Sequence, residues 1–115
     1  MVKVILGYRI MPGLTPAEYD RWLYDIHVPD LLANPYLRRI AFNTVVGTLR
    51  GDQGFYRIAE LHYNDMPSYE RARAWSEANP VPVERGPQGR TDFIFTVLCE
   101  VVEVEAGAPQ PVRPA

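Results

Sequence analysis

The chain begins with alternating apolar and polar side chains, a pattern typical of a strand that buries one face. Within residues 2–11, the apolar side chains that share a face are Val2, Val4, Leu6, Tyr8 and Ile10. Pro12 and Gly13 follow them and predict a turn at the end of this strand.

A helix is predicted next, and its start is the best-marked boundary in the sequence. Thr15 can cap it, Pro16 suits its first position, and Glu18 completes a capping box. Its apolar stripe has helical spacing and consists of Tyr19, Trp22, Leu23 and Ile26. Pro29 lacks an N–H, and its ring crowds the carbonyl four residues earlier. We therefore expect the helix to end or kink near Val28, with Val28 pushed toward extended geometry.

Two further strands and a second helix follow. Residues 36–47 and 55–63 have strand-like sequences, and the glycine-bounded residues 48–54 between them predict a hairpin. Asp65 and Pro67 mark the start of the second helix. The apolar stripe of this helix is Met66, Tyr69, Ala72 and Trp75.

Three prolines and two glycines predict a loop over residues 79–91, and residues 92–105 follow as a long fourth strand. We expect a single domain over residues 1–104 and a flexible, proline-rich tail at 105–115. The βαββαβ order is typical of an α+β, ferredoxin-like sandwich, in which a four-stranded antiparallel sheet carries two helices on one face.

Both faces of this sheet are expected to be apolar, although two helices can cover only one. One face of the fourth strand would hold Phe93, Phe95, Val97, Cys99 and Val101, and the other Ile94, Leu98 and Val102. The second strand would divide Leu37, Ala41 and Val45 from Ile40, Phe42 and Val46. Each Å² of apolar surface removed from water contributes about 25 cal/mol of stability. We therefore expect a partner to cover the face that the helices leave exposed. We expect a homodimer whose sheets pack face to face.

Composition narrows the choice of partners. The 115 residues are 47% hydrophobic and 23% charged, and the net charge of -2 gives no reason to expect nucleic acid or an anionic membrane. Cys99 is the single cysteine, so neither an intrachain disulfide nor a cysteine-rich metal site is available. The sequence starts as a strand and has no apolar run near the roughly 20 residues of a membrane span. We expect a cytoplasmic protein with a small-molecule partner.

Three segments together carry a family resemblance: "YRIMPGLTPAEYDRWLYDIHVPDLL", "LRRIAFNTVVG" and "IAELHYNDMPSYERA". Over residues 2–104 the chain resembles the dimeric α/β-barrel superfamily, most closely its EthD-like and REDY-like branches, in which an early helix carries an H-x-P type segment. Members include methylmuconolactone isomerases, polyketide cyclases, cofactor-free quinone-forming monooxygenases and proteins of unknown activity. The resemblance implies a pocket between the helices and the sheet of each protomer.

Two histidines are the candidate acid–base groups. His27, in the H-x-P segment, is either a border residue that favours the helix C-terminus or a proton carrier at neutral pH. Tyr24 and Asp30, three positions away on either side, are its candidate orienting partners. His62, near the end of the third strand, is a second acid–base candidate or a solvated strand residue. Neither histidine has metal-ligand spacing, so we expect no metal.

Candidate binding residues are less specific. Arg39 with Asn43 could hold a carboxylate, or Arg39 could form an ordinary cross-strand ion pair, and the sequence does not decide whether Arg38 or Arg39 faces a pocket. Several aromatic side chains could enclose a flat ligand or simply fill the core: Tyr8, Trp22, Tyr56, Tyr69 and Trp75.

Motifs for triad hydrolases, NTPases, dinucleotide enzymes and thioredoxin-like catalysts do not occur in the sequence. The family resemblance therefore leads us to expect a cofactor-independent isomerase. It would act by proton transfer on a small conjugated carboxylic acid or lactone, such as an aromatic ring-cleavage product. The alternatives are a polyketide or aromatic cyclase, a cofactor-free monooxygenase, or a non-catalytic accessory protein that binds a small molecule.

Overall fold

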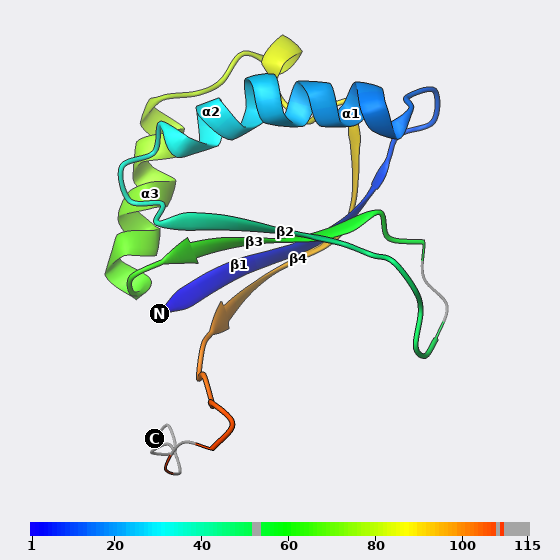
Figure 1. The fold of residues 1–115 in the computed structure, drawn as a ribbon. Coiled ribbons are helices and arrows are strands. Elements are labelled where there is room, and N and C mark those ends of the chain that lie inside the picture. Colours follow the sequence, from blue (N-terminus) through cyan, green and yellow to red (C-terminus); the bar gives the residue numbers. More distant parts are fainter. Residues whose placement is uncertain (52–53, 108, 110–115) are drawn as a thin grey trace.

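One antiparallel sheet forms the base of the molecule and carries the helices on a single face (Figure 1). The computed structural model describes residues 1–51, 54–107 and 109. The strands are β1 (Val2–Ile10), β2 (Arg39–Thr44), β3 (Arg57–Tyr63) and β4 (Thr91–Glu100). They lie in the order β2-β3-β1-β4, and every neighbouring pair is antiparallel. The predicted ferredoxin-like α+β fold is confirmed.

The helices begin where the sequence predicts. The helical segments are α1 (Pro16–Trp22), η1 (Leu23–His27), α2 (Val28–Leu32), α3 (Met66–Ala78) and the short η2 (Val83–Arg85). Thr15 accepts from the Glu18 N–H, and Glu18 accepts from the Thr15 N–H at 3.0 Å, so the capping box is confirmed. Asp65 caps α3 by accepting from the Ser68 N–H at 2.8 Å.

The expectation for Pro29 is wrong in one respect. Val28 has helical geometry, with φ -60° and ψ -47°, and the chain stays helical to Leu32. Between α1 and α2 the helix widens into the π turn η1, in which the Val28 N–H bonds to the carbonyl of Leu23, five residues earlier. A wider turn accommodates the proline ring, which a regular α-helix would force against a carbonyl.

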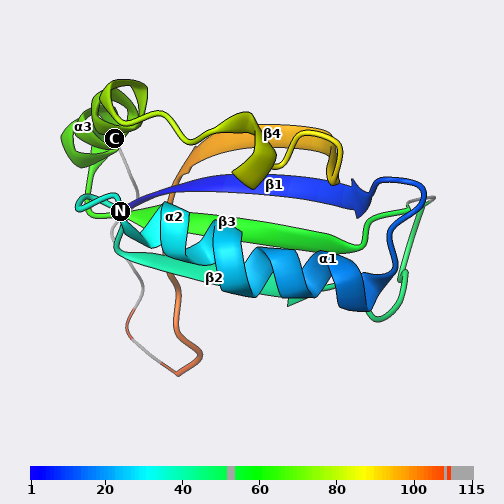
Figure 2. The ribbon, with the colours of Figure 1, turned by 90° about the horizontal axis from the view of Figure 1, so that it is seen from above.

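α1 lies over one end of the sheet and α3 lies at the other end (Figure 2). A cluster of buried residues packs beside each of them. Under α1 the buried members are Tyr8, Tyr19, Trp22, Leu23 and Ala59. Beside α3 they are Val2, Tyr63 and Ala72. An ion pair fastens the first end, because Asp20 of α1 receives two hydrogen bonds from the guanidinium of Arg57 on β3. Between these two clusters, the space over the middle of the sheet is less completely filled.

The sheet face without helices, called the open face below, differs from the prediction. A β-bulge pairs Gly7 with Phe95 but the next residue, Tyr8, with Phe93. Ile94 is the extra residue, so Phe93 turns toward the helices while Phe95 stays on the open face. The open face of β2 is also not uniformly apolar, since it presents Arg39, Ala41 and Asn43.

The tail prediction mostly concerns residues outside the described part of the chain, and the single-domain prediction stays a prediction. Residues 101–105 are irregular, so β4 is shorter than predicted. No helix in the described residues is both long and apolar enough to cross a bilayer.

The close approach of Phe95 to Gly7 gives a stability test. A Cβ at Gly7 would overlap the Phe95 ring, which packs edge-on against Phe55. We expect Gly7→Ala to lower the free energy of unfolding in urea by about 1–3 kcal/mol. The control is Gly47→Ala, where an added Cβ meets nothing within 4 Å. Equal stability of the two variants would contradict the strand register described here.

Candidate functional site

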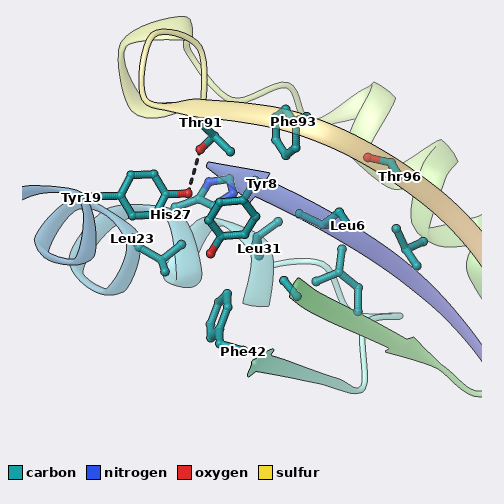
Figure 3. A pocket seen from close by; sticks show the side chains of 13 residues that line it. Leu6, Tyr8, Tyr19, Leu23, His27, Leu31, Phe42, Thr91, Phe93 and Thr96 are labelled. Carbon is teal, nitrogen blue, oxygen red and sulfur yellow. Dashed lines mark hydrogen bonds between the residues drawn. The ribbon is translucent and has the colours of Figure 1, made fainter. Parts of the chain in front are cut away.

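A cavity of about 320 Å³ lies between the first helix and the sheet (Figure 3). The sheet contributes the side chains of Val4, Leu6, Tyr8, Phe42, Ala59, Leu61, Thr91, Phe93 and Thr96. The helix contributes Tyr19, Leu23, His27 and Leu31. The walls are almost entirely apolar, so the few polar atoms among them determine what the cavity can recognise.

The π turn aligns the helical side of this cavity. The four helical residues that line the cavity are spaced four positions apart. In a regular α-helix, residues four apart are displaced by about 40° around the helix axis. A π turn needs more than four residues per revolution, so residues four apart in it are displaced around the axis in the opposite direction. Leu23 and His27, the ends of η1, consequently lie on the line that continues to Leu31. His27, which a regular helix would leave at the edge of the apolar stripe, faces the cavity.

His27 is partly buried, and its ring lies beside an aromatic side chain. Its ring stacks on the indole of Trp22, with the centroids 4.7 Å apart and the planes 19° apart. Nδ1 is buried and has no hydrogen-bond partner in the described residues. Burial lowers the pKa of His27 below its ordinary value, and the nearby carboxylate of Asp30 opposes this shift only in part. The imidazole is therefore neutral at pH 7 and able to accept a proton.

Tyrosine hydroxyls supply the other polar atoms. The Tyr8 hydroxyl is buried and makes no hydrogen bond of good geometry within the described residues, although the Arg57 guanidinium and the Tyr19 hydroxyl lie close enough to influence its pKa. Burial raises that pKa and outweighs the lowering by Arg57, so the hydroxyl keeps its proton. The Tyr19 hydroxyl differs, because it shares a 2.8 Å hydrogen bond with the Thr91 hydroxyl. Tyr8 and His27 thus bring two unsatisfied polar groups to one apolar cavity, a potential donor and a potential base.

A second cavity, of about 340 Å³, lies toward α3 and shares His27, Leu31 and Leu61 with the first. Its other lining residues are Asp30, Asn34, Leu37, Tyr63, Trp75, Ser76, Asn79, Val81, Gly86 and Pro87. The polar groups here are largely used within the fold: Asn34, for example, donates to the Ala72 carbonyl and the Ser76 hydroxyl. His27 therefore stands between an apolar and a more polar space.

Arg85 organises the surroundings of His27, and sequence reasoning missed it. Its carbonyl accepts from the Trp22 indole N–H at 2.9 Å, and its guanidinium binds both carboxylate oxygens of Asp30 at 2.9 and 3.0 Å. Arg85, at the end of η2, thus holds both the ring stacked on His27 and the carboxylate that acts on the pKa of His27. Only the fold brings them together, because 55 residues separate Arg85 from Asp30.

Three of the predicted site residues lie on the open face, away from the cavity. His62, Arg39 and Asn43 surround Glu60, which accepts from Asn43 at 2.8 Å and pairs with Lys3 at 2.8 Å. Arg39 Nη2 lies 3.5 Å from His62 Nδ1. Burial is also the main cause that lowers the pKa of His62. The sheet separates this cluster from His27, so the two histidines do not form one site.

The predicted aromatic residues have different positions. Tyr8 lines the first cavity and Trp75 the second, while Trp22 lies behind His27. Tyr56 packs against Tyr8, and its hydroxyl donates to Asp20 at 3.0 Å. Tyr69 packs at the α3 end, edge-on to Tyr63. Among the described residues, no three His, Cys, Asp or Glu side chains are grouped as metal ligands would be.

Solved structures of the same fold were found by comparison. An ethyl tert-butyl ether D (EthD) family protein from Bacillus halodurans is 21% identical, with a TM-score of 0.64, over 89% of this chain and 99% of that one. HapK from Hahella chejuensis is 10% identical, with a TM-score of 0.60, over 95% and 100%. At3g17210 from Arabidopsis thaliana is 18% identical, with a TM-score of 0.69, over 91% and 99%.

These likenesses establish the ferredoxin-like fold, and at such identities they establish nothing about the chemistry. No protein-family model matches the chain, and no curated protein matches it in sequence. The site must therefore be interpreted from its own geometry.

The electrostatics of His27 can be tested by titration. Asp30 favours the imidazolium, so Asp30→Asn should lower the pKa of His27 still further. NMR titration of the ring protons would measure this shift, with His62→Gln used to assign the two histidines. Asp25→Asn is the matched control, because Asp25 is exposed and also lies close to His27 in sequence. An unchanged or higher pKa in Asp30→Asn would contradict the proximity of the two groups.

Proposed function

We propose that this protein is a cofactor-independent isomerase that moves a proton on a small conjugated carboxylic acid or lactone bound in the first cavity. His27 is the acid–base residue, and Tyr8 holds the oxygen that gains charge. The aromatic and aliphatic walls enclose the carbon skeleton.

One observation carries the proposal: the walls of a single apolar cavity contain two buried polar atoms, Tyr8 Oη and His27 Nδ1, that make no hydrogen bond of good geometry within the described residues. Leaving such an atom unsatisfied costs about 1–3 kcal/mol, so folded proteins generally provide each with a partner. A ligand with a hydrogen-bonding oxygen and an acidic C–H would satisfy both.

The proposed reaction balances without a cofactor. In the tautomer with its hydrogen on Nε2, Nδ1 of neutral His27 takes a proton from a carbon next to a carbonyl. The electron pair of the broken C–H bond moves toward the carbonyl oxygen, to which the Tyr8 hydroxyl donates. The imidazolium then returns the proton to another carbon of the conjugated system and becomes neutral again.

Related functions would use the same two groups. A cyclase would direct the enolate at a second carbonyl, and a cofactor-free monooxygenase would expose it to oxygen. A non-catalytic accessory protein would only hold the molecule. The lowered pKa of His27 keeps its imidazole in the neutral form, which is the form that can accept a proton.

We also propose that the protein acts as a homodimer through the open face. On β4, 46% of the Val97 surface is exposed on this face, beside Phe95 and Cys99. Next to this apolar strip lies the charged cluster around Glu60, which would set the register between two copies. Two-fold pairing is the commonest way to cover such a face.

Removing the base tests the catalytic role. We expect His27→Ala to lose about 10²-fold or more in kcat on a panel of enol lactones and conjugated acids, while ligand binding changes little. In the unaltered protein kcat/KM should fall only below pH 6.5, because the pKa of His27 is lowered and the neutral form is active. Arg73→Ala, an exposed change on α3, is the control. A loss of affinity alone in His27→Ala would indicate a binding protein.

Sedimentation equilibrium tests the dimer. We expect a mass of two chains at micromolar concentration, and Val97→Asp should shift it to one chain by placing a charge in the apolar strip. Val83→Asp is the matched control, because Val83 is 64% exposed on the η2 turn, on the helical side. A single-chain mass for the unaltered protein would refute the homodimer.

A further inference from the structure

Building on the proposed function, we infer that the cavity binds an uncharged ligand, a ketone, an enol or a lactone, and discriminates against the carboxylate of the same size. Of the two substrate classes expected from the sequence, this selects the lactone. The inference comes from the charges around the two cavities that share His27.

Neither cavity offers a cation. Among the described residues that line the first cavity there is no lysine or arginine, and the same is true of the second. The charged group that does line the second cavity is Asp30, a carboxylate. A bound anion would therefore lose its hydration without gaining a counter-charge, which is strongly unfavourable.

Nearby arginines are already engaged by the fold. Arg57, which is 5% exposed, donates through Nε to the Thr44 hydroxyl and through both terminal nitrogens to Asp20. It lies close enough to the Tyr8 hydroxyl to lower the pKa of that group, but the Asp20 carboxylate balances its charge. Arg85 uses its guanidinium on Asp30. Breaking either pair to bind a ligand would leave a carboxylate without its partner.

Two further arginines, Arg90 and Arg39, are no better placed. Arg90 donates to the Gly86 carbonyl at 2.8 Å, and its guanidinium lies 5.2 Å from the centre of a Trp22 ring. Arg39, the sequence candidate for carboxylate binding, lies on the open face beside His62. Neither of these two arginines is therefore available to a ligand beside His27.

The polar atoms that remain match a neutral oxygen. The Tyr8 hydroxyl can donate one hydrogen bond to a carbonyl or accept one from an enol. One phenol cannot satisfy a carboxylate, which accepts at about four positions. Burial also keeps His27 neutral, so it does not supply the missing positive charge. The cavity surrounds a ligand with Leu6, Leu23 and Phe93, so a flat neutral ring would lose its hydration there at little cost in free energy.

Three probes with one ring system separate charge from shape: 2-naphthol, 2-naphthoate and methyl 2-naphthoate. Their dissociation constants would be measured by calorimetry at pH 7.5 with the full-length protein. We expect 2-naphthol and the methyl ester to bind at least 10-fold more tightly than 2-naphthoate. We also expect Tyr8→Phe to weaken 2-naphthol about 10-fold, whereas Tyr36→Phe, the same change outside both cavities, leaves it unaltered.

The outcomes distinguish this inference from the proposed function. If 2-naphthoate bound as tightly as 2-naphthol and Tyr8→Phe weakened both, the preference for a neutral ligand would be refuted, but the cavity would remain the substrate site. The inference would also be overturned if none of the three probes bound. The same holds if Tyr8→Phe left the dissociation constant of 2-naphthol unchanged. Loss of turnover in His27→Ala tests the catalytic role independently of all these results.

Discussion

Pro29 has no amide hydrogen, and its ring occupies the space that a regular α-helix gives to the carbonyl four residues earlier. The chain keeps its helix by widening one turn, so that the Val28 N–H bonds to Leu23. This turn brings His27 onto the same line as Leu23 and Leu31, toward the sheet. The site thus depends on a backbone constraint, and it agrees with the general association of π turns with functional positions.

The cavity exists because the helices are fastened at the two ends of the sheet. Asp20 and Arg57 hold α1 at one end, with the tyrosine cluster packed around them. At the other end, Ala72 of α3 packs on Val2 and Tyr63. The loop before β4 is tied to the first helix through Arg85. These contacts hold the helices on both sides of His27 and leave the space between them unfilled.

The two histidines illustrate how the faces of one sheet create different chemistry. His62 lies among Lys3, Arg39 and Glu60, a cluster of charges in mutual contact on the open face. His27 lies in an apolar wall with an indole against its ring. Burial lowers the pKa of both, yet only His27 lines the cavities. Position on a face, more than residue type, therefore decides which histidine can meet an enclosed ligand.

Local sequence determined the strand alternation of β1, the capping box of α1, the N-cap of α3 and the turns. Through the order of these elements it also determined the ferredoxin-like fold, because such signals act between residues a few positions apart. It also singled out His27 and Tyr8 as candidates. Only the tertiary structure decided the bulge at Ile94 that separates Phe93 from Phe95, and the pairing of Arg85 with Asp30. It also moved Arg39, Asn43 and His62 away from the cavity. Each of these depends on contacts between distant segments, which periodicity along the chain does not encode.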